Sequence, residues 1–359
     1  MAAQFWRDKR VFITGHTGFK GSWLTLWLHR WGAKVYGYSL PAPTSPSLFH
    51  LARLQTCAQT IIGDVRDTKH LSETMASVQP DIVFHLAAQP LLREMDQTPI
   101  DTFSTNIMGT AHLLEAVRHT PSVRAVVIVT SDKCYENREW LWGYREDDPM
   151  GGHDPYSSSK GAVELITSAF RRTYFSKDPE NCPAVATVRA GNIIGGGDFS
   201  ADSLIPDFIR VLEKQEAINI RNPHAIRPWQ FVLEPLSGYM QVAQRLYEAG
   251  HTYATGWNFG PADTDLQTVA QLCATFNHSL QKHDVEPIEI RLEAGIHSPQ
   301  EEAFLRLDIS KARQRLNWIP KLELYSALEL TAQWYAGYIN NEDLRSLSES
   351  QIDFYQNLT

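Results

Sequence analysis

Two short segments near the middle of the chain carry side chains that can transfer protons. The first, TSDKCY, places Ser131, Asp132 and Lys133 in a row directly after the apolar run AVVIV. The second, YSSSK, places Tyr156 four positions before Lys160. Alcohol, carboxyl, amine and phenol groups at such spacing are the groups that general acid and base catalysis uses. The side chains of the two segments are therefore candidates for proton transfer.

Tyr156 and Lys160 stand at the start of a helical pattern, so they lie on one face about one turn apart. A nearby ammonium favours the phenolate, and so would a positively charged ring bound beside it. This predicts that the pKa of Tyr156 moves down from about 10 toward working pH, which makes Tyr156 a candidate base. Taken alone, the same pair also fits an exposed tyrosine and lysine at a helix start.

Asp132 and Lys133 suit an acid and a base if burial keeps the carboxyl protonated and the amine neutral. Consecutive strand residues point to opposite faces, so Ser131 and Lys133 would share a side that Asp132 does not. The chain must therefore bend after Ser131. The alternative interpretation is an ion-paired lysine and a capping aspartate at the entrance of a loop.

The elements that position these residues alternate between apolar strands and helices, which is typical of βαβ units around a parallel sheet. We expect strands at residues 11–14, 34–38, 60–64, 81–89, 125–131 and 184–197, and helices at 21–31, 71–78, 105–118 and 156–174. This order predicts a Rossmann-like doubly wound α/β fold with a second, smaller α/β lobe. We place the boundary between residues 1–190 and 191–359 and expect segments near 236–260 to return to the first domain.

A glycine turn follows the first predicted strand, in TGHTGFKG, with Gly15, Gly18 and Gly21 at intervals of three. Such a turn lets backbone N–H groups and a helix N-terminus approach a pyrophosphate. The acid that usually holds the adenosine ribose is missing, since Tyr38 and Ser39 stand in its place. The sequence therefore leaves open the choice between NAD and NADP.

The glycine turn, the strand-ending Ser131 and the YxxxK pair together resemble the extended short-chain dehydrogenase/reductase family over nearly the whole chain. GDVRD from Gly63, HLAAQ from His85 and NIMGT from Asn106 also match it. The resemblance implies NAD as cofactor, held by Gly15, His16, Thr17, Gly18, Phe19, Lys20, Gly21, Asp64, Val65, Ala87, Ala88, Gln89, Asn106, Thr130, Tyr156 and Lys160. Local sequence alone allows Asp64 either an adenine contact or a turn role.

Members of this family oxidise a sugar-nucleotide hydroxyl and then diverge. A 4-epimerase needs no further acid or base, whereas a 4,6-dehydratase needs both, so the resemblance gives Ser131, Asp132, Lys133, Tyr156 and Lys160 catalytic roles. Known dTDP-glucose 4,6-dehydratases carry Asp-Glu where this chain carries Asp-Lys. SDK, RAGNIIGGGD and RPWQFVLEP resemble the CDP-glucose 4,6-dehydratase branch.

This branch implies CDP-glucose as substrate, and a homodimer formed through the helices before and after the catalytic tyrosine. The residues implied to contact the substrate are Gln89, Ser131, Asn192, Ser203, Leu204 and Arg227, with Ile205 near the base. Trp229 suits either ring stacking or the core. Arg93, Glu94 and His297 are polar residues without an assigned role.

Composition excludes several other classes of protein. The 359 residues carry a formal net charge of −8, which disfavours a nucleic-acid partner. The four cysteines have no metal-ligand spacing, which predicts reduced thiols in a cytoplasm and no metal site. The N-terminal residues predict neither a signal peptide nor a membrane span. The rival interpretations are a nucleotide-sugar 4-epimerase and a catalytically silent dinucleotide-binding sensor.

Overall fold

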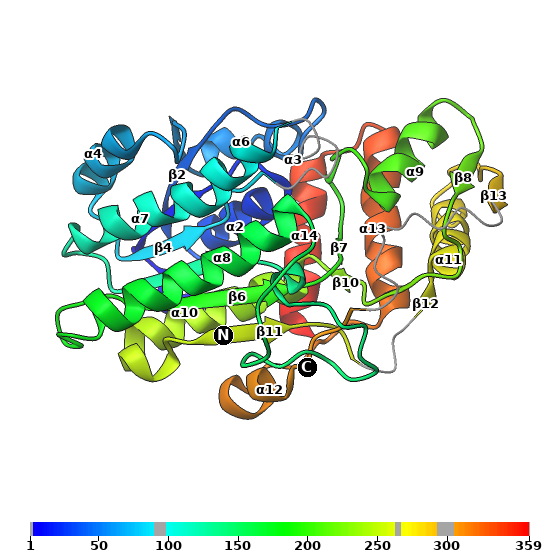
Figure 1. The fold of residues 1–359 in the computed structure, drawn as a ribbon. Helices are drawn as coiled ribbons and strands as arrows, with labels where there is room; N and C mark the ends of the chain where they lie inside the picture. Colours follow the sequence, from blue (N-terminus) through cyan, green and yellow to red (C-terminus); the bar gives the residue numbers. More distant parts are fainter. Residues whose placement is uncertain (1–2, 90–97, 263–266, 293–304, 359) are drawn as a thin grey trace.

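A seven-stranded parallel sheet forms the centre of the protein in the computed structural model, which describes residues 3–89, 98–262, 267–292 and 305–358 (Figure 1). The strand order is β11-β6-β5-β4-β1-β2-β3, and every neighbouring pair is parallel. This is the predicted doubly wound arrangement. The strands are β1 (Arg10–Thr14), β2 (Lys34–Ser39), β3 (Gln59–Ile62), β4 (Ile82–His85), β5 (Ala125–Val129), β6 (Ala184–Ala190) and β11 (Gly256–Phe259).

Helices cover both faces of this sheet, because its strands are apolar on both sides. Alternate residues of a strand enter different cores: Val127 of β5 packs in the same cluster as Trp23 and Met240, whereas Val126 packs with Leu71 and Leu113. The first cluster lies under α2 (Phe19–Arg30) and α10 (Leu233–Ala249). The second lies under α4 (Thr68–Val78), α7 (Gly109–Arg118) and α8 (Pro155–Phe170), which run side by side in Figure 1.

A smaller group of elements lies beyond the carboxyl ends of the strands, at the right of Figure 1. It contains the strand pairs β7–β10, β9–β12 and β8–β13. Their bounds are β7 (Ile193–Ile194), β8 (Ile218–Ile220), β9 (Ile226–Arg227), β10 (Gln230–Phe231), β12 (Gln267–Thr268) and β13 (Ile290–Leu292). Its long helices are α9 (Leu204–Glu213), α11 (Val269–Gln281) and α13 (Leu324–Ile339).

The remaining elements are short, apart from the C-terminal helix. They are α1 (Ala3–Trp6), α3 (Leu48–Leu51), α6 (Pro99–Phe103), α12 (Ser310–Leu316) and α14 (Leu344–Asn357), the 3₁₀ turns η1 (Leu54–Thr56), η3 (Asp132–Cys134) and η5 (Gly250–Tyr253), and the π-helical turns η2 (Ser104–Met108) and η4 (Arg171–Phe175). In the part of the chain that the structure describes, no helix is both long and apolar enough to cross a membrane.

Several predicted elements have different bounds in the structure. The strand predicted over 81–89 ends at His85, where the chain leaves the sheet and the amide of Ala87 donates to the hydroxyl of Thr14. The strand predicted over 184–197 is broken into β6 and β7. β11 pairs with β6, so the chain does return to the large sheet after α10.

A buried carboxylate joins α10 to the C-terminal part of the chain. Glu234 accepts hydrogen bonds from the amides of Lys321 and Leu322 and from the hydroxyl of Tyr355, at 2.7–2.8 Å. Burial raises the pKa of Glu234 to about 7, although these three donors oppose the shift. A single side chain therefore couples the packing of α10 and α14 to pH.

We predict that Glu234 makes the protein less stable as pH rises from about 4.5 to about 7, because in this range the unfolded chain releases the proton that the folded protein keeps. Replacing Glu234 with Gln, which cannot ionise, should remove this pH dependence, a relative change on the order of 3 kcal/mol. Denaturant unfolding across this pH range measures it. If the free energy of unfolding changed with pH in the same way in the wild type and in Glu234→Gln, the prediction would be contradicted. Glu248→Gln, at an exposed position of the same helix, is the control.

Candidate active site

The predicted bend after Ser131 is present. β5 ends at Val129, and the 3₁₀ turn η3 begins at Asp132. The hydroxyl of Ser131 accepts a hydrogen bond from the amide of Lys133 at 3.3 Å and donates one to a carboxyl oxygen of Asp132 at 2.9 Å. These two bonds close the turn, so Ser131, Asp132 and Lys133 leave the alternation of a strand and gather at the edge of the sheet.

The helix α8 places Tyr156 and Lys160 beside this bend. Asp154 caps the helix, because its carboxylate accepts from the amide of Ser157 at 2.8 Å, and Pro155 occupies the first helical position. Lys160 is one turn further on. Its Nζ donates to the carbonyl of Val129 at 3.3 Å and lies 5.7 Å from the ring centroid of Tyr156.

The glycine turn after β1 leaves a cradle beside the same edge. Gly15 has a positive φ of 73°, and a Cβ on Gly21 would lie 2.2 Å from the carbonyl oxygen of Gly15. The N-cap of α2 is Gly18, which provides no side-chain cap, so the first amides of this helix are free of side-chain acceptors at that position. A pyrophosphate fits such a helix end.

Other residues of the cradle are tied to the protein itself. The ring of His16 contacts the hydroxyls of Ser39 at 2.9 Å and Thr60 at 3.1 Å, and Thr17 donates to the carbonyl of Leu40 at 3.0 Å. Phe19 and Lys20 begin α2. His16 therefore connects the glycine turn to β2 and β3 through side-chain hydrogen bonds.

The loop after β4 forms the next wall of the cradle. The side-chain amide of Asn106 accepts from the amide of Gln89 and donates to the hydroxyl of Ser159, which fastens this loop, with Ala87 and Ala88, to α8. The carboxylate of Asp64 is held by Arg66, at 2.6 Å in the shortest contact, and the neighbouring Val65 is buried. Both roles proposed for Asp64 from the sequence, adenine contact and turn, fit this position.

A cavity of about 240 Å³ opens at the start of the smaller group of elements. Its lining includes three residues predicted to contact substrate, Asn192, Ser203 and Leu204, together with Ile205 and Trp229. Arg227 lies in β9 and pairs with β12, outside the residues that line the cavity. The structure thus brings the Asn192 and Ser203 segments together. Arg93, Glu94 and His297 lie outside the described residues.

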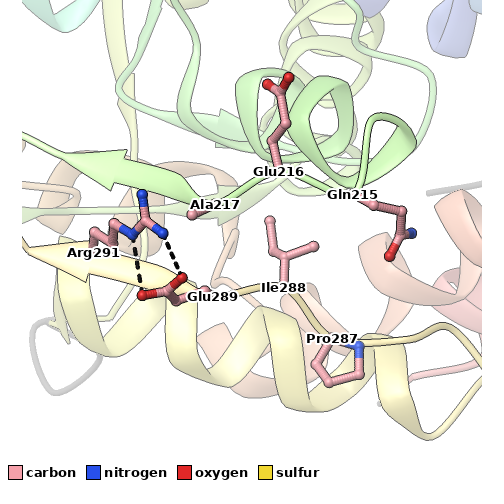
Figure 2. A pocket seen from close by; sticks show the side chains of 7 residues that line it. All are labelled: Gln215, Glu216, Ala217, Pro287, Ile288, Glu289 and Arg291. Atoms are coloured by element: carbon pink, nitrogen blue, oxygen red, sulfur yellow. Dashed lines mark hydrogen bonds and ion pairs between the residues drawn. The ribbon is translucent and has the colours of Figure 1, made fainter.

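A larger hollow, of about 520 Å³, lies between the segments that lead into β8 and β13 (Figure 2). It is lined by Gln215, Glu216, Ala217, Pro287, Ile288, Glu289 and Arg291. Figure 2 shows the exposed ion pair between Glu289 and Arg291 at one side, and Glu216 points away from the hollow. Its lining includes none of the residues predicted for the site.

Comparison with known proteins identifies the family. A sequence profile described as GDP-mannose 4,6 dehydratase matches residues 12–331. The chain belongs to this family. It is 51% identical over 359 residues to a CDP-glucose 4,6-dehydratase of Salmonella typhimurium, covering 99% of this chain and 98% of the relative. A dTDP-glucose 4,6-dehydratase of Xanthomonas campestris is 28% identical, covering 90% of this chain and 92% of the relative.

Solved structures show the same fold. DesIV, a dTDP-glucose 4,6-dehydratase of Streptomyces venezuelae with NAD and TYD bound, has a TM-score of 0.77 and 22% identity, covering 93% of this chain and 98% of that chain. A UDP-glucose 4-epimerase of Stenotrophomonas maltophila has a TM-score of 0.80 and 20% identity, covering 93% of this chain and 100% of that chain. Dehydratases and epimerases therefore share this architecture, and local residues must separate their reactions.

Burial dominates the electrostatics of the site in this 4,6-dehydratase family member. Burial raises the pKa of Tyr156 to about 12, although a hydrogen bond with Ser131 opposes the shift. In the chain's own groups desolvation outweighs this hydrogen bond, and the downward shift predicted from the sequence, which also involves a bound positive ring, stays a prediction. Burial also lowers the pKa of Lys160 to about 7, and the charge of Lys20 lowers it further.

Lys20 and Tyr239 are site residues whose position the sequence did not indicate. Lys20, predicted only as a cofactor ligand, is placed by the fold within electrostatic range of Asp132 and Asp198; burial lowers its pKa, and these two acids oppose the shift. Tyr239 of α10 is fully buried beside Asp132. In the helical pattern of α10, Tyr239 occupies an ordinary core position. No feature of the sequence therefore distinguished Tyr239 from a core residue.

Glu164, on the buried side of α8, is a third residue whose position the sequence analysis did not assign. Glu164, one turn beyond Lys160, is buried and paired with Arg189 of β6 at 2.7 Å. Thr130, predicted as a cofactor contact, donates its hydroxyl to Glu164 at 2.6 Å. An acid on the apolar face of the YxxxK helix was the available signal, because charged residues are rarely buried without a partner.

We predict that Tyr156→Phe lowers kcat by about 10²–10⁴-fold while leaving the fold intact, because it removes the proton acceptor but keeps the ring. Turnover and thermal unfolding of the purified variant measure the two effects. Tyr253→Phe, which removes a hydroxyl remote from the site on η5, is the matched control. Full activity in Tyr156→Phe would show that another group is the base.

Proposed function

We propose that this protein is a hydro-lyase that converts CDP-glucose to CDP-4-keto-6-deoxyglucose and water, with NAD as internal redox partner. The observation that carries the proposal is the bend after β5, which gathers Ser131, Asp132 and Lys133 beside Tyr156. A dehydration needs this additional acid and base, whereas an epimerisation does not. The relative named CDP-glucose 4,6-dehydratase, at 51% identity over nearly the whole chain, supports the same reaction.

The first step is oxidation at C4 of the sugar. Ser131 donates a hydrogen bond to the C4 oxygen, and Tyr156 accepts the proton of the C4 hydroxyl. Lys160 favours the phenolate and holds the nicotinamide ribose from its place beside the Tyr156 ring. The cradle of Gly15, Gly18 and Gly21 would hold NAD, which would supply a hydride acceptor for C4 and a hydride donor for C6.

The second step is elimination of water across C5 and C6. The C4 ketone makes the C5 proton acidic, and the amine of Lys133 removes it. Asp132 gives a proton to the C6 hydroxyl, which departs as water. Hydride returns to C6, Lys133 returns a proton to C5, and the proton that Tyr156 took from the C4 hydroxyl replaces the one that Asp132 gave up. The product therefore differs from the substrate by one water, and no net oxidation occurs.

The cavity at Asn192 supports a cytosine-bearing nucleotide. The described residues that line it include the acids Asp198 and Asp202 but no Lys, Arg or His. This favours a nucleobase in the cavity over a diphosphate. A carboxylate accepts from the exocyclic amine of cytosine, where uracil and thymine present an oxygen acceptor instead. We propose Arg227 as the contact to the diphosphate, outside this cavity.

The same reasoning supports the domain division. We propose that residues 1–190, joined by α10 and β11, form the NAD-binding domain, and that the rest of residues 191–359 forms the nucleotide-sugar-binding lobe. The substrate then lies between the cradle and the cavity, across the carboxyl edge of the sheet. We also propose that the enzyme works in the cytoplasm, where nucleotide sugars and reduced thiols occur together.

We propose a homodimer formed through α7, α8 and their neighbours. Large apolar side chains are exposed on this side of the protein, which is unusual for a surface that meets only water. They are Ile100 of α6, Met108 of η2, Leu165 of α8 and Tyr174 of η4. The elements are in contact with one another, since α8 packs against α6, η2, α7 and η4. A second copy placed on this surface would cover them.

We predict that Leu165→Asp converts the dimer to a monomer, because it places a charge in an apolar interface. Sedimentation of the variant and the wild type at several concentrations measures the change. The matched control is Leu292→Asp, since Leu292 is 55% exposed on the distant β13 and Leu165 is 63% exposed. A dimer that persists in Leu165→Asp would place the interface elsewhere.

The reaction itself is tested with CDP-glucose deuterated at C4 and with NAD supplied. We expect a product lighter by one water, with deuterium recovered at C6, by mass spectrometry. An unchanged mass with inverted C4 would make the protein a 4-epimerase. Tight NAD binding without turnover of any nucleotide sugar would favour a sensor.

The nucleotide is tested by comparing CDP-glucose with UDP-glucose and dTDP-glucose in the same assay. We expect kcat/KM for CDP-glucose to be higher by about tenfold or more, because cytosine offers an amine donor to these carboxylates where uracil and thymine offer an oxygen acceptor. Equal values for the three substrates would remove the assignment of Asp198 and Asp202 to base recognition.

A further inference from the structure

We propose that Glu164 is a positioning residue that sets the spacing between the oxidation pair, Tyr156 and Lys160, and the elimination pair, Asp132 and Lys133. The inference rests on the proposed dehydration, because only that reaction needs both pairs at one sugar. Glu164 itself touches neither substrate nor cofactor in this assignment. It acts through the segment that carries the elimination pair.

The carboxylate of Glu164 is the centre of a buried cluster. One oxygen accepts from the hydroxyl of Thr130 at 2.6 Å, and the other accepts from the hydroxyl of Thr187 at 2.7 Å. The guanidinium of Arg189 donates to both oxygens, at 2.7 and 2.8 Å. Two threonines and one arginine thus saturate a single carboxylate inside the protein.

This cluster anchors both ends of the elimination segment. Thr130 directly precedes Ser131 in the chain, so its bond to Glu164 fixes the entrance of the bend. Arg189 donates to the hydroxyl of Tyr135 at 2.5 Å, and that hydroxyl donates to Asn258 of β11 at 2.8 Å. Residues 131–134 are therefore held between two points that lead back to the same carboxylate.

Glu164 also belongs to the helix of the oxidation pair. Tyr156, Lys160 and Glu164 are spaced by four on α8 and follow one side of it. The helix fixes the distance from Glu164 to Tyr156, and the cluster fixes the distance from Glu164 to the bend. A hydroxyl-to-carboxylate bond of defined length sets position more narrowly than apolar packing does.

Glu164 and Arg189 form a buried ion pair, which is unusual because charged side chains are seldom buried. The side chains of Glu164 and Arg189 are only 6% and 4% exposed. Burial raises the pKa of Glu164, yet the net shift is downward because Arg189 and the two threonine hydroxyls favour the carboxylate. Apolar side chains of similar volume could fill such a site, so the ionic pair is better explained by the geometry that it imposes.

Two threonines provide a matched test, since each donates one buried hydrogen bond to the same carboxylate. Thr130→Val removes the hydrogen bond that holds the start of the bend to Glu164. Thr187→Val removes only the hydrogen bond that holds β6 to the same carboxylate. In a single turnover with CDP-glucose and NAD, we expect Thr130→Val to slow elimination by about tenfold or more relative to C4 oxidation. Reduced nicotinamide should then accumulate and be seen by its absorbance. Thr187→Val should follow the wild type within about twofold.

Glu164→Gln should show the same accumulation of reduced nicotinamide, because it removes the charge that fixes Arg189. The threonine pair decides the question if this variant fails to fold. Equal behaviour of Thr130→Val and Thr187→Val, or a loss of oxidation together with elimination, would overturn the positioning role. A wild-type protein that does not lose water from CDP-glucose would instead overturn the proposed function on which the inference rests.

Discussion

The arrangement of the site depends on the bend that ends β5. A strand turns successive side chains to opposite faces, so an uninterrupted β5 could not bring Ser131, Asp132 and Lys133 to one place. The hydroxyl of Ser131 resolves this by accepting from the amide of Lys133 and donating to Asp132, which begins a 3₁₀ turn at the edge of the sheet. Asp132 and Lys133 are thereby brought to the edge of the sheet beside Tyr156.

The parallel sheet explains why this edge is the place for chemistry. The glycine turn after β1, the loop after β4 and the bend after β5 all leave the sheet at the carboxyl ends of neighbouring strands. The helix α8 crosses beside them, with Lys160 bonded to the carbonyl that ends β5. Dehydratases and epimerases share this frame, so the fold by itself does not decide between their reactions.

Burial dominates the proton chemistry at this edge. It raises the pKa of Tyr156 to about 12 and lowers the pKa of Lys160 to about 7, because each charged form loses solvent. Charge compensation then decides which groups remain ionised. Glu164 keeps its charge because Arg189 and two hydroxyls surround it, whereas burial lowers the pKa of Lys20 against the opposing effect of Asp132. A cofactor with a positive ring adds to the same balance when it binds.

The sequence by itself determined the order of strands and helices, the glycine turn and the need for a bend after Ser131. These are local properties, set by apolar periodicity and by the geometry of a strand. Tertiary structure alone decided that Glu164, Thr130 and Arg189 meet, and that Lys20 lies near Asp132. It also decided the pKa of Tyr156, since desolvation depends on segments far apart in the chain. Sequence spacing shows which groups are neighbours along a helix, but only the packed fold determines how much water each group loses and which charge compensates for it.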